Sequence, residues 1–277
     1  MATDLSPRSD RAIERAINIA HEKDATLTIL HVIDGDLPKG VVEAQKRIAA
    51  ETINEQVETL TKGERTHISV QVVLGRPYME ILEMSDRMDA EMVILGTHHK
   101  DVLRDMFQGT TVERVVRVCH APVLVVKDLV HGPYTQVMIG VDFSVFSRRA
   151  IEFAVFFVPG ASFNLVHAYH VPYKGFLHSK SIEEEVKKQE QLELQSMVDE
   201  EMATFLSSLS AENPTLNTIM QEGAVRDVIY EQIQLLKPDL LVIGTHGRTG
   251  VAHAFLGSVA EDVLNQPPCD VLVVKAW

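Results

Sequence analysis

Three glycines and a serine near the end of the chain have a spacing that suits phosphate binding. Gly244 and Gly247 follow the apolar run DLLVI, and Gly257 with Ser258 opens the next segment of helical periodicity. Glycine lets another group approach the backbone closely. The first turn of a helix offers unpaired N–H groups and the positive end of a dipole, which together attract a phosphate. The pattern G-x2-G-x9-G-S therefore predicts a phosphate cradle between a strand and a helix.

A purely structural interpretation of the same residues stays open. Ser258 and Glu261 have the spacing of a capping box, in which two side chains satisfy the first N–H groups of a helix. Thr110 and Glu113 have the same spacing earlier in the chain. A capped helix after a glycine loop needs no ligand. The loop also matches neither GxxxxGK[ST] nor GxGxxG, which disfavours those two kinds of nucleotide site.

The segments that must position this loop occur twice in the chain. VLVVK at 123–127 returns at 271–275, and ILGTH at 94–98 corresponds to VIGTH at 242–246. TDLSPRSDRAI near the start likewise corresponds to VDFSVFSRRAI, which begins at Val141. Repetition on this scale indicates one domain present in two copies.

We predict that the two domains span 1–128 and 136–277. The segment between them contains a Gly–Pro step, which breaks regular structure. The first domain begins at MATD, where the second has QVMIGVD, so we expect its first strand to be truncated.

Each copy alternates short apolar runs with segments of helical periodicity. This order predicts an α/β fold in which five parallel strands form a sheet with helices on both faces. Ligands of such sheets bind at the carboxyl ends of the strands. His31 and His167 fall near the ends of the second strands, and we expect each to be a packed, hydrogen-bonded side chain.

With these features the chain resembles a tandem universal stress protein over essentially its whole length. ATP-binding members of that family carry G-x2-G-x9-G-[S/T], which the second copy matches. The resemblance implies an adenine nucleotide α-hydrolase-like fold that binds ATP or another adenine nucleotide, with Mg²⁺ as a candidate companion ion. It implies that Asp142 contacts the adenine, that Ala168 lies beside the nucleoside, and that the glycine loop wraps the ribose and phosphates. The binding residues it implies are Val141, Asp142, Ser144, Ala168, Gly244, Thr245, His246, Gly247, Arg248, Gly257, Ser258 and Val259.

The first copy departs from the pattern at its second glycine. His99 stands there, and a Cβ with an imidazole would crowd a phosphate and resist positive φ. The nine-residue spacer of the first copy also carries Asp101 and Asp105, whereas that of the second carries no acid. Asp4 does match Asp142. We therefore predict that the second domain binds ATP and that the first binds it weakly or not at all.

Charge and composition exclude several other classes of protein. A net charge of −13 argues against nucleic acid and against an anionic membrane surface as partners. The start of the chain lacks the apolar core of a signal peptide, and Cys119 and Cys269 have no metal-binding spacing. These features lead us to expect a cytoplasmic protein. His98, His99 and His246 have no accompanying carboxylate or cysteine cluster, so we predict no metal site.

The leading functional hypothesis is a nucleotide-binding regulatory protein of the stress response. No nucleophile–base pair accompanies the binding residues, so we predict no catalytic residue and at most a weak ATPase. A slow ATP hydrolase and a ligand-free interaction scaffold are the alternatives. We also expect the two VLVVK strands to pair within one chain as an internal pseudo-dimer, which would cover two sheet edges. Association of two chains into a homodimer stays open.

Overall fold

A computed structural model describes residues 1–33, 38–62, 67–97, 110–170, 184–209, 216–245 and 256–275, with the backbone alone at Lys39 and 184–191. These residues form two compact units. Unit 1 contains the chain up to Pro133 together with α9 (Ser258–Asn265) and β10 (Asp270–Val274). Unit 2 runs from Tyr134 through the strand that ends at Gly244. The units thus differ from the sequence repeats, because the last helix and strand of the second repeat pack with the first unit.

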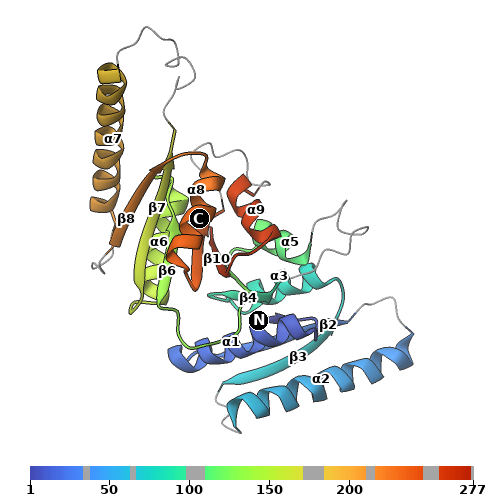
Figure 1. Ribbon diagram of the computed structural model, residues 1–277. Coiled ribbons are helices and arrows are strands. Elements are labelled where there is room, and N and C mark those ends of the chain that lie inside the picture. Colours follow the sequence, from blue (N-terminus) through green and yellow to red (C-terminus); the bar gives the residue numbers. More distant parts are fainter. Residues whose placement is uncertain are drawn as a thin grey trace. The chain divides into compact units, whose positions relative to one another are not determined.

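Unit 1 is built on a sheet whose strands follow the order β3-β2-β1-β4-β5-β10. Its strands before β10 are β1 (Ala2–Thr3), β2 (Leu27–Ile33), β3 (Ile68–Leu74), β4 (Val93–Gly96) and β5 (Val123–Val126). Its described helices before α9 are α1 (Pro7–Lys23), α2 (Lys39–Thr61), α3 (Pro77–Arg87) and α5 (Thr111–Val118). The chain runs from β1 outward to β3 and then returns to β4 and β5 on the other side. Right-handed connections therefore place α1 and α2 on one face and α3 and α5 on the other (Figure 1).

Unit 2 contains four described strands in the order β9-β6-β7-β8, all parallel. These are β6 (Gln136–Gly140), β7 (Ser162–Tyr169), β8 (Leu216–Glu222) and β9 (Leu240–Gly244). The described helices are α6 (Val145–Phe157), α7 (Glu184–Ser207) and α8 (Val225–Leu236). Helix α6 packs on β6 and β9, whereas α8 packs on β6 and β7. The predicted α/β fold, with parallel strands and five of them in each repeat, is confirmed.

The pairing predicted for the two VLVVK strands is also confirmed. β10 lies antiparallel to β5, with Leu272 opposite Leu124, and both leucines are fully buried. Asp270, the first residue of β10, is fully buried as well. One oxygen of its carboxylate accepts hydrogen bonds from the backbone N–H groups of Lys127 and Asp128, at 2.8 and 2.9 Å. The other lies 3.5 Å from Nε of Arg15, so a buried ion pair joins α1 to the last strand of the sheet.

No helix in the described part of the chain is both long and apolar enough to cross a membrane.

Candidate functional site

The carboxyl end of β6 carries a tight turn that fixes two of the predicted site residues. Oδ1 of Asp142 accepts hydrogen bonds from the backbone N–H and the hydroxyl of Ser144, at 3.0 and 2.6 Å. Oγ of Ser144 in turn accepts the N–H of Ser147 at 3.2 Å and caps α6. Phe143, between them, has a φ of 62°. A non-glycine residue held in this sparsely populated region is a common feature of functional strand ends.

The neighbouring strand brings Ala168 to the same end of the sheet. β6 and β7 are parallel, with Gly140 opposite Val166, so Val141 and Ala168 follow at adjacent strand ends. His167 Nδ1 lies 2.7 Å from the carbonyl oxygen of Val141. Because that oxygen can only accept, Nδ1 carries the proton. The predicted packed and hydrogen-bonded role of this histidine is therefore confirmed.

The first repeat reproduces this turn. Oδ1 of Asp4 accepts the N–H of Ser6 at 3.0 Å, Leu5 has a φ of 61°, and His31 Nδ1 lies 2.9 Å from the carbonyl oxygen of Thr3. Burial raises the pKa of Asp4, but hydrogen bonds from Ser6 and Ser9 outweigh it and leave this pKa below its ordinary value. The positive φ values at Leu5 and Phe143 were not predicted from the sequence. The repeated Asp-x-Ser before each helix was the available signal.

Gly244 has a structural role that does not depend on a ligand. A Cβ at this position would lie 2.8 Å from the Cβ of Phe146 and 3.1 Å from its backbone carbon, and real contacts are longer. Gly96 is equally tight, since its Cβ would lie 3.0 Å from the Cα of Ser9. The first glycine of the pattern thus allows the first helix of each repeat to pack on the fourth strand. This packing requires no ligand.

We predict that Gly244→Ala lowers the free energy of unfolding by about 1–3 kcal/mol, because the added methyl group meets backbone that cannot move without shifting α6. Gly140→Ala is the matched control at the end of β6, where a Cβ would meet only side chains, the nearest at an ordinary 3.5 Å. Urea unfolding of the two variants checks the difference. Equal stability in both would show that the Phe146 contact relaxes without cost.

The start of α9 holds the last described part of the predicted site. Gly257 is the N-cap, Ser258 is the exposed first helical residue, and no described side chain caps this end. The capping-box interpretation that the sequence left open for Ser258 and Glu261 is therefore wrong. Glu261 instead accepts a hydrogen bond from Nη2 of Arg117 at 2.5 Å.

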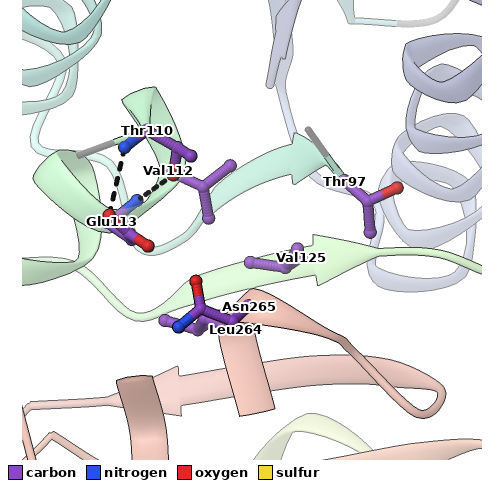
Figure 2. Close-up of a pocket in the computed structure, with 7 residues that line it drawn as sticks. All are labelled: Thr97, Thr110, Val112, Glu113, Val125, Leu264 and Asn265. Carbon is purple, nitrogen blue, oxygen red and sulfur yellow. Dashed lines mark hydrogen bonds between the residues drawn. The ribbon is translucent and has the colours of Figure 1, made fainter. Parts of the chain in front are cut away.

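The capping box predicted at the start of α5 is confirmed. Oε2 of Glu113 accepts the N–H of Thr110 at 3.1 Å, and Oγ1 of Thr110 accepts the N–H of Glu113 at 3.2 Å. Both side chains are buried and line a small pocket together with Thr97, Val112, Val125, Leu264 and Asn265 (Figure 2). Thr110 of the first repeat corresponds to Ser258 of the second. The carboxylate of Glu113 therefore already accepts the N–H group at the position where the sequence pattern predicts phosphate binding.

A comparison with models of protein families identifies the family of this chain. The model described as the universal stress protein family matches residues 1–127 and again residues 133–275. The chain belongs to the universal stress protein family. The double match confirms that this universal stress protein is a tandem of the family's domain.

Relatives of this universal stress protein include both tandem-length and shorter chains. A universal stress protein of Mycobacterium tuberculosis is 23% identical over 302 residues, which cover 99% of this chain and 96% of the relative. One of Methanocaldococcus jannaschii is 33% identical over 133 residues, which cover 45% of this chain and 78% of the relative. The crystal structure of a universal stress protein from Archaeoglobus fulgidus covers 99% of this chain and 96% of its own, with a TM-score of 0.69 and 20% identity. That likeness supports the fold.

Several predicted residues lie outside the described part of this universal stress protein. These are His246, Gly247 and Arg248 of the second loop, and His98, His99, Asp101 and Asp105 of the first. Within the described residues, no three His, Cys, Asp or Glu side chains come together as a metal-binding group. Both cysteines are buried, and neither is in a disulfide.

Proposed function

We propose that this universal stress protein binds an adenine nucleotide, ATP in the first instance, through its second repeat and acts as a regulatory protein of the stress response. Asp142 is the proposed adenine contact, with Val141 and Ala168 beside the nucleoside. The phosphates are assigned to the glycine loop and to Gly257, Ser258 and Val259 on the sequence pattern alone. Binding of the nucleotide regulates the protein if two of its conformations or assemblies differ in affinity for that nucleotide.

The observation that carries the proposal is the turn at the end of β6. Its carboxylate is fixed by two hydrogen bonds from Ser144 and lies at the carboxyl end of a parallel strand, where ligands of such sheets collect. Val141 and Ala168 stand at the ends of this strand and of its neighbour. These groups can bind and orient a nucleoside. They supply no nucleophile with an adjacent base, so the proposal is binding rather than catalysis.

The first repeat is proposed to bind weakly or not at all. It has the same Asp4 turn, but Glu113 already accepts the N–H of Thr110, where a phosphate oxygen would otherwise bind. A buried carboxylate beside a phosphate would also repel it. This supports one nucleotide per chain.

The test is native mass spectrometry of the purified chain followed by calorimetric titration with ATP, with and without Mg²⁺. We expect about one nucleotide per chain in the wild type and loss of binding in Gly247→His, which copies His99 into the second loop. The matched variant His99→Gly should leave the second-repeat affinity unchanged. Two nucleotides per chain would contradict the assignment to the second repeat. Binding of neither ATP nor ADP would favour a ligand-free scaffold, and phosphate release during titration would favour a slow hydrolase.

A further inference from the structure

The proposed adenine contact lies at one end of a row of three residues that crosses the carboxyl ends of β6, β7 and β8. The N–H of Val141 donates to the carbonyl oxygen of Val166 at 2.9 Å, so the pairing of β6 with β7 continues past the last residue of β6. Asp142 therefore follows at the level of Ala168 on the neighbouring strand. Ala168 in turn lies opposite Gln221 of β8. The row is thus Asp142, Ala168 and Gln221, all within unit 2.

The side chains of Ala168 and Gln221 lie on the face of the sheet that α8 covers. Opposite residues of two parallel strands share a face, and Gln221 reaches α8 through two hydrogen bonds. Its Nε2 donates to Oε2 of Glu231 at 2.7 Å, and its Oε1 accepts from Nε2 of Gln232 at 2.6 Å. Ala168 therefore places only a methyl group beside a polar side chain that α8 holds in place.

The two hydrogen bonds also fix which way the amide of Gln221 is turned. A carboxylate can only accept, so Glu231 requires the NH2 group of Gln221 on its side and leaves the oxygen on the other. Gln232, which is 8% exposed, donates to that oxygen. These two bonds use one N–H of Nε2 and one lone pair of Oε1, and an amide has two of each. Gln221 thus offers a further donor and a further acceptor in a defined order.

That order suits the edge of an adenine base. Adenine presents its N6 amino group beside the acceptor N7, and a glutamine amide pairs with this edge through two hydrogen bonds. Neighbouring strands lie about 5 Å apart, so the backbones at Asp142 and Gln221 are about 10 Å apart across Ala168. A purine lying over the methyl group of Ala168 can reach both side chains. Hypoxanthine has an oxygen at position 6, which would face Oε1 of Gln221 without a proton between them.

The first repeat has a different row at the same place. It consists of Asp4, Val32 and Val73. A bulkier β-branched side chain stands in the middle, and an apolar side chain replaces the amide. Met84 also stands where α8 has Gln232. These side chains cannot form the amide network, which agrees with the weak or absent binding proposed for the first repeat.

We propose that Gln221 hydrogen-bonds the edge of the base that the second repeat binds, opposite Asp142, and that Glu231 and Gln232 are positioning residues that orient its amide. The inference rests on the proposed function. It adds the residue that selects the base, because the oriented amide matches purines with an amino group at position 6 and rejects those with an oxygen there.

The test is calorimetric titration of the full chain with adenosine and with inosine, which differ at position 6 of the base. The wild type should bind adenosine about 3- to 10-fold more tightly than inosine, the size of one hydrogen bond. Gln221→Val, which copies Val73 of the first repeat, should weaken adenosine binding by a similar factor and abolish the preference. Gln232→Met, which copies Met84, should reduce the preference while Gln221 remains, because the amide is then free to turn.

Asn217→Val is the matched control. It removes an amide near the other end of the same strand, where Asn217 bonds Asn164 of β7, and it should leave both affinities unchanged. A loss of adenosine binding in this control equal to that in Gln221→Val would indicate a general disturbance of β8 and would overturn the inference.

Two further outcomes would overturn the inference and leave the proposed function standing. One is equal affinity of the wild type for adenosine and inosine. The other is an unchanged preference for adenosine in Gln221→Val. If the wild type binds none of ATP, adenosine and inosine, the proposed function fails and the inference fails with it.

Discussion

Replacing Asp270 with alanine is expected to lower the free energy of unfolding by about 3–5 kcal/mol. The carboxylate of Asp270 is fully buried and accepts two backbone N–H groups. Its negative charge also pairs with the guanidinium of Arg15, which is only 5% exposed. Alanine would leave a buried guanidinium without its counter-ion and two N–H groups without an acceptor. Each of these costs free energy, because the guanidinium of Arg15 is buried and the two half-buried N–H groups lose a charged acceptor.

Denaturant unfolding of Asp270→Ala, Asp270→Asn and Asp239→Ala checks this prediction. Asparagine keeps an acceptor for the N–H groups of Lys127 and Asp128 but loses the charge, so an intermediate loss is expected. Asp239 also accepts backbone N–H groups, those of Thr135 and Gln136, but in an exposed setting where water replaces the carboxylate. We expect Asp239→Ala to cost about 1 kcal/mol. A loss at Asp270 no larger than that at Asp239 would show that Arg15 finds another partner or water.

Replacing Asp142 with alanine is expected to weaken adenine-nucleotide binding about 10- to 100-fold, which corresponds to loss of a hydrogen bond to a charged group at about 1.5–3 kcal/mol. The change removes the proposed adenine contact. It also releases the backbone N–H and hydroxyl of Ser144, which hold the turn at the end of β6. Calorimetric titration with ATP and with adenosine measures the effect, and both ligands should be weakened alike because the contact is to the base.

Asp4→Ala is the matched control. It removes the same kind of turn from the first repeat, where Asp4 accepts the N–H of Ser6. Its cost in stability should resemble that of Asp142→Ala, but nucleotide affinity should stay within twofold of the wild type. An equal loss of affinity in both variants would mean that the nucleotide responds to either repeat. No loss in either would remove Asp142 from the binding site.

Much of the fold could be predicted from the sequence because it depends on local patterns. The short apolar runs form strands, and the segments of helical periodicity form helices. The repeated VLVVK segments form the paired strands β5 and β10. The capping box of Thr110 and Glu113 was predicted correctly for the same reason, since both partners lie within one turn. The turn residues Asp142 and Ser144 were likewise placed at the strand end where they lie.

What local patterns could not reveal are contacts between residues distant in sequence. The spacing of Ser258 and Glu261 left a capping box open, but Arg117, which lies 144 positions earlier, binds Glu261 instead. The sequence pattern likewise did not reveal that Phe146, almost a hundred positions before Gly244, leaves no room for a Cβ there. In both cases the local pattern allowed two outcomes. A tertiary neighbour that no spacing rule reveals selected between them.

The antiparallel pairing of β5 with β10 also constrains how this protein is made. β5 ends at Val126, whereas β10 begins at Asp270, so the ribosome must synthesise the whole second repeat before the sheet of unit 1 can gain its last strand. Until then β5 is an edge strand with four apolar residues and unpaired backbone groups, the kind of surface that pairs with other chains. Contacts between such distant segments also form slowly. The nascent chain therefore passes through a stage in which protection of β5 by chaperones matters more than it does for the finished protein.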